Sequence, residues 1–290
     1  MFKNLSAAAL GVSGRQSEII ESALSNGFRG IDLDLNEIAA QAASQGLPLA
    51  RRLLDSAKLK YGSAPLPVRL ADDAAYKTDL AALPQAAELA AALGCTRLRA
   101  ILEPASDDHP FHENFETHRR RLTEVAGILA KHGLSLAVGI DPTPARRAGQ
   151  HYEFIYTLDN LLMLLSLVAG KNVGVAADLW ALQVTGAGWE GLKKVKREQL
   201  LTVDISDARD GSPDAGRLLP GDGGVIDAAA VLAYLADIGF DGPVTPRRDP
   251  QQYPSQSREA ICRDAGQKLD AVWKAAGLSP AGKLQAVAGK

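Results

Sequence analysis

Short runs of aliphatic and β-branched residues alternate with longer Ala/Leu-rich runs along the whole chain. The short runs have the length and composition of buried strands, and the longer ones repeat apolar positions at the helical spacing. The predicted strands are residues 5–10, 30–35, 67–70, 97–102, 135–140, 173–178, 200–206 and 243–245. The predicted helices are residues 18–25, 37–56, 77–93, 114–131, 157–168, 189–196, 228–238 and 257–275. This alternation indicates a parallel sheet covered by helices.

Eight strand–helix units within 290 residues are typical of a single α/β domain, the (β/α)₈ or TIM barrel. A doubly wound sheet would carry a phosphate-binding glycine fingerprint after its first strand. The glycines at positions 11 and 14 are too sparse for that motif. We therefore predict one barrel over residues 1–276. Apolar periodicity is lost beyond it, so residues 277–290 are predicted to be a C-terminal tail, either frayed or a surface helix.

Charge and composition exclude some partners. The chain has 32 Lys+Arg and 34 Asp+Glu, a formal net charge of −2, so no overall field favours nucleic acid or an anionic membrane. Apolar runs are too short to span a bilayer, and the first twelve residues lack the features of a signal peptide. We expect a cytoplasmic protein. Cys95 and Cys262 belong to no CxxC pair and are interpreted as reduced thiols.

Candidate chemistry lies at the carboxyl ends of the predicted strands, where barrels of this kind place their active sites. Polar residues gather there: Asp32, Asp34, Arg69, Asp72, Asp73, Glu103, Asp141, Asp178, Asp204, Asp207, Arg247, Arg248 and Asp249. Most of these positions need no function, because loops are polar in general. Asp178 and Asp204 differ because they sit in or at the end of apolar runs, where a carboxylate needs a partner. These two are the candidate catalytic residues.

Several segments resemble motifs of the sugar phosphate isomerase/epimerase family, whose members have a xylose isomerase-like TIM barrel. Residues 27–33 (GFRGIDL) are similar to GFxGIEL, and residues 172–178 (NVGVAAD) to NVGLLLD. Residues 203–208 (VDISDA) resemble VHxxDA, residues 219–227 (LPGDGGVID) resemble LPGxGxID, and residues 239–244 (GFDGPV) resemble GYDGPV. Together the motifs follow the family's order over strand two and strands five to eight.

The resemblance implies a divalent-metal site made of a Glu ending strand five, an Asp ending strand six, a His in strand seven and a Glu ending strand eight. In active relatives the two glutamates also move protons. The corresponding residues here are Gly139, Asp178, Asp204 and Arg247, or its neighbour Pro246. Only the aspartate of strand six is retained. The chain is therefore interpreted as a divergent member with a degenerate metal site.

Two further positions can be compared with the family. The histidine that usually follows the strand-six Asp by three positions falls on Ala181, so that substrate contact is lost. Arg217 matches a position where relatives often place a substrate-binding arginine. It joins Arg247, Asp141, Trp180 and His109 as the candidate substrate-binding residues.

A charge argument predicts what the substitutions do together. The family's four ligands sum to about −3 and reach about −1 with a divalent ion, whereas Gly139, Asp178, Asp204 and Arg247 sum to about −1 without one. An inward-pointing Arg247 would bridge the two aspartates and replace the metal, so no cofactor is predicted. Two alternatives stay open. Arg247 could point to solvent, or an oxygen-only site for Mg²⁺ or Mn²⁺ could form from Asp141, Asp178, Asp204 and Asp207.

The remaining candidates surround this centre. His109, His112 and His118, in a segment similar to an HPFxENFxxH run of some relatives, are expected at the surface or as helix caps, and His151 in a long loop after strand five. Arginines are predicted around one rim and favour an anionic ligand: Arg146, Arg147, Arg217, Arg247 and Arg248.

Three hypotheses follow. The first is a divergent barrel that binds a small polar, sugar-like or anionic ligand without metal-dependent isomerisation, as a pseudoenzyme. The second is an active sugar isomerase or epimerase whose acid/base work or metal has moved to Asp178, Asp204 or a loop histidine. The third is a barrel that serves only as a scaffold for a partner. Relatives are often dimers or tetramers, so the resemblance also allows a homo-oligomer.

Overall fold

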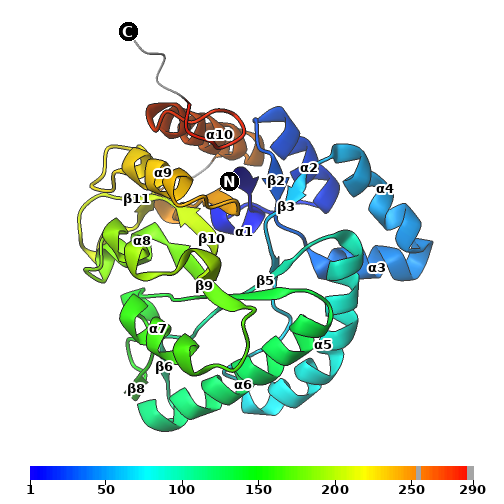
Figure 1. Cartoon of the computed structure of the whole chain (residues 1–290), viewed down its shortest axis with the longest axis vertical. Helices are drawn as coiled ribbons and strands as arrows, with labels where there is room; N and C mark the ends of the chain where they lie inside the picture. Colours follow the sequence, from blue (N-terminus) through cyan, green and yellow to red (C-terminus); the bar gives the residue numbers. More distant parts are fainter. Residues whose placement is uncertain (253–255, 286–290) are drawn as a thin grey trace.

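The computed structural model describes residues 1–252 and 256–285. Within them, nine parallel strands form one sheet in the order β3-β2-β1-β13-β10-β9-β7-β5-β4 (Figure 1). The strands are β1 (Phe2–Leu5), β2 (Gly30–Ile31), β3 (Lys60–Tyr61), β4 (Ala64–Pro65), β5 (Arg97–Ile101), β7 (Ser135–Gly139), β9 (Val173–Asp178), β10 (Leu200–Ile205) and β13 (Pro243–Pro246).

The two end strands of that order, β3 and β4, are consecutive parts of one extended segment. The Gly62 amide donates to the Ile31 carbonyl at 2.9 Å, and the Leu33 amide donates to Ser63 at 2.9 Å. On the other side, the Leu66 amide donates to the Arg99 carbonyl at 2.8 Å. The segment thus joins β2 to β5 and closes the sheet. With β3 and β4 counted as one strand, the fold is the predicted (β/α)₈ barrel.

Helices surround the barrel on the outside (Figure 1). They are α1 (Ala7–Leu10), α2 (Gln16–Ser25), α3 (Leu35–Gln45), α4 (Leu47–Ala57), α5 (Asp73–Leu93), α6 (Phe111–Lys131), α7 (Leu158–Leu167), α8 (Leu179–Val184), α9 (Ala228–Asp237) and α10 (Arg258–Ala275). Their apolar faces and the strands form one continuous buried core. No helix within the described ranges combines the length and apolarity needed to cross a membrane.

Aspartates cap several helices of the barrel. Asp34 accepts hydrogen bonds from the first-turn amides of α3, Asp72 does so for α5, Asp178 for α8 and Asp227 for α9. Each cap satisfies amide groups that have no partner inside the helix. Asp34 and Asp72, two polar residues of the predicted rim, therefore have a structural task.

Short antiparallel strands and 3₁₀ helices shape the loops at the carboxyl ends of the barrel strands. β6 (Ala105–Ser106) pairs with β8 (Tyr152–Glu153), and β11 (Asp207–Ala208) pairs with β12 (Arg217–Leu218). The 3₁₀ helices are η1 (Pro144–Arg146), η2 (Trp189–Lys194), η3 (Arg197–Gln199), η4 (Pro213–Ala215) and η5 (Pro250–Gln252). The β11–β12 pairing aligns Arg217 with Ala208 and so brings this arginine back toward the strand ends.

Four predicted elements were placed wrongly. Strand one ends at Leu5, because Ser6 caps a helical Ala-Ala-Ala-Leu turn. Strand three is the segment 60–65 rather than 67–70, since prolines at 65 and 67 have no amide hydrogen for further sheet pairing. The predicted helix 37–56 is two helices, broken at Gly46 with a φ of +84°. The predicted helix 189–196 is a 3₁₀ helix over Trp189–Lys194 in place of an α-helix.

The C-terminal segment folds back on the barrel as far as it is described. Leu278 is buried and pairs with Leu284 in an antiparallel bridge, and the Trp273 indole donates to the Ser279 carbonyl at 2.9 Å. Residues 277–285 therefore form a packed turn in place of a frayed end or a helix. The rest of the predicted tail, residues 286–290, lies outside the described residues, and the division at residue 276 stays a prediction.

Candidate functional site

Two buried aspartates face each other at the barrel mouth, the end at which the carboxyl ends of the strands open. In the sheet register Asp204 of β10 is paired with Asp178 of β9 on one side and with Thr245 of β13 on the other. Asp204 is fully buried and Asp178 nearly so. Adjacent buried carboxylates repel each other and lose hydration, so both need cationic partners.

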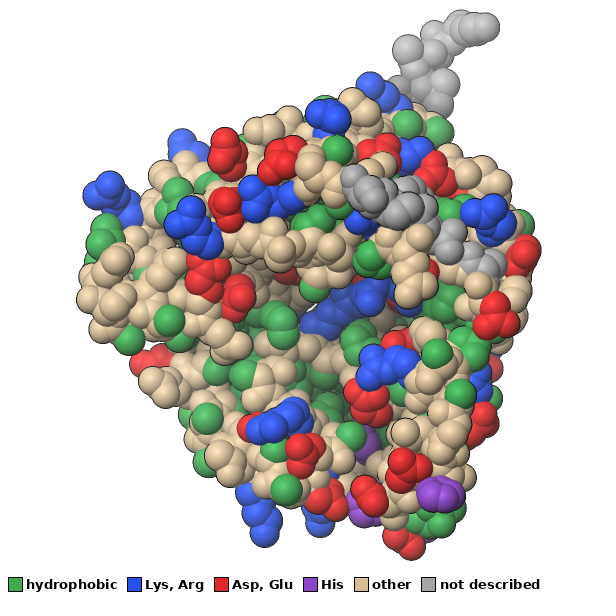
Figure 2. Space-filling model, turned by 180° about the vertical axis from the view of Figure 1, so that it is seen from behind, with side chains coloured by type: hydrophobic (Ala, Val, Ile, Leu, Met, Phe, Trp, Pro, Cys, Tyr) green, Lys and Arg blue, Asp and Glu red, His purple; other side chains and the backbone are tan. Residues whose placement is uncertain are grey.

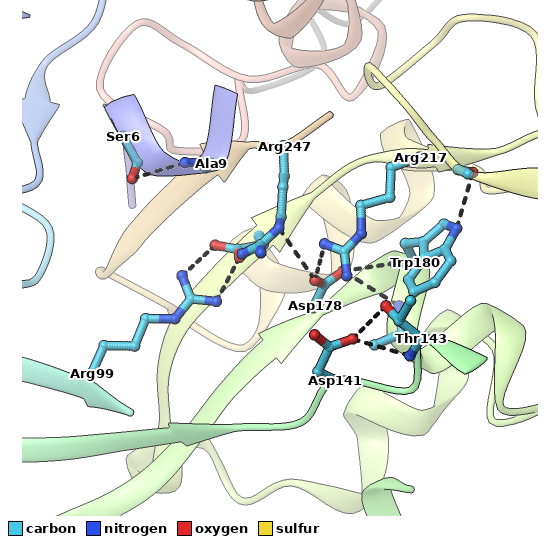
Figure 3. Close-up of polar contacts among 12 residues, drawn as sticks. Ser6, Ala9, Arg99, Asp141, Thr143, Asp178, Trp180, Arg217 and Arg247 are labelled. Atoms are coloured by element: carbon cyan, nitrogen blue, oxygen red, sulfur yellow. Dashed lines mark hydrogen bonds and ion pairs between the residues drawn. The ribbon is translucent and has the colours of Figure 1, made fainter. Parts of the chain in front are cut away.

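Asp204 is held by two arginines from opposite sides (Figure 3). Arg99 of β5 donates from Nη1 to Oδ1 at 2.9 Å and from Nη2 to Oδ2 at 2.5 Å, a bidentate pair. Arg247, which follows β13, donates from Nη1 to Oδ2 at 2.9 Å. Burial favours the neutral acid, but the charges of Arg99 and Arg247 outweigh it and lower the pKa of Asp204 to about 2. The carboxylate is therefore ionised and a weak base.

Asp178 has a different set of donors. Its Oδ1 accepts the backbone amides of Trp180 and Ala181 at 3.1 and 3.3 Å, which is the N-cap of α8. Its Oδ2 accepts Nη1 of Arg217 at 2.5 Å and lies 3.8 Å from Nε of Arg247. Arg247 thus bridges both aspartates, as the inward orientation predicts.

Arg217 is fixed by an aromatic side chain as well as by Asp178. Its guanidinium carbon lies 4.4 Å from the ring centre of Trp180, whose indole donates to the Gly216 carbonyl at 3.0 Å. The stacking and the ion pair together leave this side chain 11% exposed. Trp180 therefore holds Arg217 in place by stacking against its guanidinium. Sequence reasoning did not assign this role to Trp180.

The cluster has an excess of positive charge. We call Arg99, Arg217, Arg247, Asp178 and Asp204 the arginine–aspartate cluster. Within these five residues three guanidinium groups outnumber two carboxylates, whereas the charge count from the sequence, without Arg99 and Arg217, gave about −1. An excess charge in a partly buried site attracts an anion. Arg247 is the most accessible of the three arginines, with 31% of its side chain exposed against 13% for Arg99.

Two cavities meet at Arg247. The first, the Asp32 cavity, has a volume of about 460 Å³ and is lined by Asp32, Ser63, Arg99 and Arg247 among others. The second, the Trp180 cavity, has a volume of about 520 Å³ and is lined by Asp141, Trp180, Arg217 and Arg247 among others. Figure 2 shows a hollow in one face of the molecule with Lys or Arg side chains at its floor. Arg247 lines both cavities and also contacts Asp178 and Asp204 at the centre of the cluster.

Asp141 lies in the Trp180 cavity beside the cluster. Its Oδ1 accepts the amide and the hydroxyl of Thr143 at 3.0 and 2.5 Å, and Arg146 approaches Oδ2 at 3.4 Å. Burial opposes ionisation, but the Thr143 hydrogen bonds and nearby arginines lower the pKa of Asp141. It is an ionised acceptor beside Arg217, and its role in substrate binding stays a prediction.

Other expected site residues are used elsewhere. His109 pairs with Asp73 at 2.9 Å and lines neither cavity. Of the rim arginines, Arg146 binds Glu103, Arg147 binds Glu153, and Arg248 is buried with Nε on the Leu10 carbonyl. Because their charges are already paired or buried, these groups do not join the cluster.

Two expectations about single side chains have clear outcomes. His118 was expected at the surface or as a cap; that expectation is wrong, because it faces inward from α6 with 1% exposure. Asp207 accepts the amides of Gly224 and Ile226 at 2.9 Å each and so anchors the following loop, the structural role expected for that turn.

The residues at the family's four ligand positions do not fit a divalent ion. A Cβ on Gly139 would lie 2.6 Å from the Ile101 side chain and 3.0 Å from the Ala176 carbonyl, so a glutamate there requires rearrangement. The space between Asp178 and Asp204 holds the Arg247 guanidinium. Across residues 1–252 and 256–285, no group of three His, Cys, Asp or Glu side chains could hold a metal ion.

The fold and this mouth define a (β/α)₈ barrel with a polar site at the carboxyl ends of its strands. Residues 7–265 match the family model of the xylose isomerase-like TIM barrel, and the chain belongs to that family. A comparison with curated proteins found no match.

Solved structures agree with this assignment. A xylose isomerase domain protein from Alicyclobacillus acidocaldarius is 25% identical over 94% of this chain and 98% of its own, with a TM-score of 0.81. The IolI protein with a bound zinc atom is 19% identical over 94% and 99%, with a TM-score of 0.75. D-psicose 3-epimerase with D-tagatose from Clostridium cellulolyticum H10 is 14% identical over 95% and 99%, with a TM-score of 0.74. The last two show a shared fold.

Sequence reasoning missed one member of the cluster and underrated a second residue nearby. Arg99 lies inside a predicted strand, and a charged residue in an apolar strand was the signal that it points to a buried partner. Asp32 appeared only as one polar residue of the rim, yet it lines the same cavity as Arg99 and Arg247. Neither connection could be read from spacing along the chain.

Proposed function

We propose that this barrel binds a small polar anion, such as a carboxylate or phosphate derivative of a sugar, at its mouth without a divalent metal. The arginine–aspartate cluster supplies the positive charge that a divalent ion supplies in a metal-dependent site. The single observation that supports this most is Arg247, which contacts both aspartates and lines both cavities. Arginine is suited to this task because its planar fork binds carboxylate and phosphate in two places at once.

The shape and the lining of the cavities favour a sugar-sized ligand. Both volumes, about 460 and 520 Å³, lie in the range typical of small-molecule sites. A structural neighbour is D-psicose 3-epimerase with D-tagatose, which makes a polyhydroxylated ligand a reasonable proposal here. The hydroxyl and carboxylate groups that line the cavities would accept and donate hydrogen bonds to such a molecule.

Asp178 and Asp204 are poor candidates for moving protons in this arrangement. Both carboxylates are held by guanidinium groups, and the pKa of Asp204 is lowered to about 2. An efficient general base has a pKa closer to the working pH. We therefore propose that these aspartates orient the arginines, and that any acid/base group lies elsewhere in the mouth.

The proposal predicts saturable binding of inorganic phosphate to the full-length protein at low ionic strength, measured by isothermal titration calorimetry. Arg247→Ala is expected to weaken that binding at least about tenfold, or about 1.4 kcal/mol, because it removes the accessible guanidinium. The variant should still fold, since Asp204 keeps Arg99 and Asp178 keeps Arg217.

Arg197→Ala is the matched control. It removes the same charge at the opposite end of the barrel, where Arg197 pairs with Asp241 at 2.7 Å. Its affinity for phosphate is expected to equal that of the wild type. No saturable binding, or equal losses in the two variants, would contradict the proposed function.

A further inference from the structure

The Asp32 cavity contains a carboxyl group that has no part in the arginine–aspartate cluster's ion pairs. Asp32 follows β2 at the barrel mouth, and the cavity also exposes Arg99 and Arg247 to the same space. Asp32 thus shares a volume of about 460 Å³ with two guanidinium groups and two further acids, Asp34 and Glu37. A ligand whose anionic group lies at Arg247 would place its remaining atoms toward this carboxyl.

Hydrogen bonds from Asn4 and Ser63 hold Oδ1 of Asp32 in place. Oδ1 accepts Nδ2 of Asn4 at 2.9 Å, the Ser63 amide at 2.9 Å and the Ser63 hydroxyl at 3.2 Å. Asn4 and Ser63 are themselves buried, so they hold the carboxyl in one orientation. Oδ2 receives none of these three bonds, and the Ser6 hydroxyl is a further hydrogen-bond partner of the carboxyl.

The surroundings keep this carboxyl more basic than an ordinary aspartate. Burial is the largest influence and raises the pKa of Asp32, while Asn4, Ser6 and Arg99 act in the opposite direction and do not cancel it. Asp204, whose charge also raises the pKa of Asp32, has its own pKa lowered to about 2 by two arginines. Asp32 therefore has the raised pKa expected of an acid/base group. Asp204 has the lowered pKa of a fixed negative charge that holds the arginines.

We propose that Asp32 is a catalytic base that takes a proton from a carbon next to the carbonyl group of an anion bound at Arg247. The inference rests on the proposed function, since the anion's place at Arg247 puts its carbon skeleton in the Asp32 cavity. It assigns a metal-independent proton transfer to this site.

The step balances without another reactant. The C–H bond breaks, its proton passes to Oδ2 of Asp32, and its electron pair forms the C=C bond of an enolate as the carbonyl oxygen becomes negative. Arg99 stabilises that oxygen from the same cavity, because each of its two terminal nitrogens gives Asp204 only one of its two hydrogen atoms. Return of a proton from Asp32 to the same carbon reforms the C–H bond and regenerates both the carbonyl group and the carboxylate.

The proposed substrate carries an anionic group and a C–H bond beside a carbonyl group. Two probes separate the sources of the anion: D-fructose 6-phosphate carries a phosphate, and D-fructuronate carries a carboxylate. Each is incubated with the full-length protein in D₂O, and proton NMR follows loss of the signals beside the carbonyl group. We expect exchange above the protein-free rate for at least one probe.

Asp32→Asn is expected to lower that exchange rate at least about 100-fold while probe affinity, measured by calorimetry, stays within about threefold. Asp227→Asn is the control away from the cavity, because Asp227 caps α9 and asparagine is an equally good cap. The control is expected to exchange at the wild-type rate.

The outcomes distinguish the two proposals. Binding of neither probe overturns the proposed function and this inference with it. Binding without exchange, or equal exchange in Asp32→Asn and wild type, overturns the inference and leaves the binding function intact. Should Asp32→Asn fail to fold, Asp32→Ala is assayed with added formate as a replacement base. Recovery of exchange supports the role of Asp32, and a rate insensitive to formate contradicts it.

Discussion

The imidazole of His118 lies on the inward face of α6, packed against Phe154 with 4.8 Å between ring centres. Its Nδ1 is 3.0 Å from the Asn114 carbonyl, which requires a hydrogen on that nitrogen. The other nitrogen, Nε2, is buried without a hydrogen-bond partner in the described structure. Burial is the largest cause that lowers the pKa of His118 to about 4, so the ring is neutral in the folded protein at neutral pH.

This histidine makes stability depend on pH in a defined window. Its pKa is about 6.5 when unfolded and about 4 when folded, so the unfolded chain binds more protons between these values. The contribution is complete above about pH 6.5 and is lost as pH falls toward 4, up to about 3 kcal/mol. Urea unfolding of wild type and His118→Gln at about pH 7 and 4.5 measures it.

The wild type is expected to lose more unfolding free energy than His118→Gln between those two pH values, by about 2–3 kcal/mol. His112→Gln is the control, because His112 is exposed on the same helix. Equal pH dependence in all three proteins would show that His118 titrates normally when folded.

At the scale of elements, the segment 60–65 closes the barrel and leaves very little free space around Gly62. Gly62, between β3 and β4, lies where an added Cβ would come within 2.5–2.6 Å of the Asn4 amide atoms and within 2.6 Å of Oδ1 of Asp32. The same residue therefore closes the sheet and allows the hydrogen bonds that orient Asp32. A change at Gly62 would therefore affect both the closure of the sheet and the orientation of Asp32.

Gly62→Ala is expected to destabilise the protein by about 1–3 kcal/mol, because the extra methyl group meets well-packed atoms. Gly127→Ala is the matched control: nothing lies within 4 Å of its added Cβ, and it sits inside α6. That change should stabilise by about 0.5–1 kcal/mol, since alanine favours the helix. Thermal or denaturant unfolding compares them, and a neutral Gly62→Ala would contradict the account of closure.

The sequence predicts an element well when the residues of that element carry the pattern themselves. β9 was predicted to the residue, because its apolar run is continuous and ends at a helix-capping aspartate. Segment 60–65 was missed because Lys60-Tyr61-Gly62-Ser63 has no apolar run, and its strand character comes from neighbours on both sides. The cluster was predicted in part for the same reason: Asp178, Asp204 and Arg247 come from separate motifs, whereas their meeting with Arg99 depends on strand register.

The whole molecule combines a slightly acidic surface with a basic centre. The chain has a formal net charge of −2, while the arginine–aspartate cluster has a net charge of +1 at the barrel mouth. The family fold is retained over residues 7–265. An anion entering this mouth would meet the accessible Arg247 guanidinium, which the overall charge does not reveal.

The central claim is that the Arg247 guanidinium occupies the place of a divalent cation between Asp178 and Asp204. Titration of the metal-stripped full-length protein with Mn²⁺, followed by the EPR signal of the free ion, tests it most directly. The account predicts no stoichiometric loss of the free-ion signal. One equivalent of Mn²⁺ bound by the wild type and released in Asp178→Asn would contradict it.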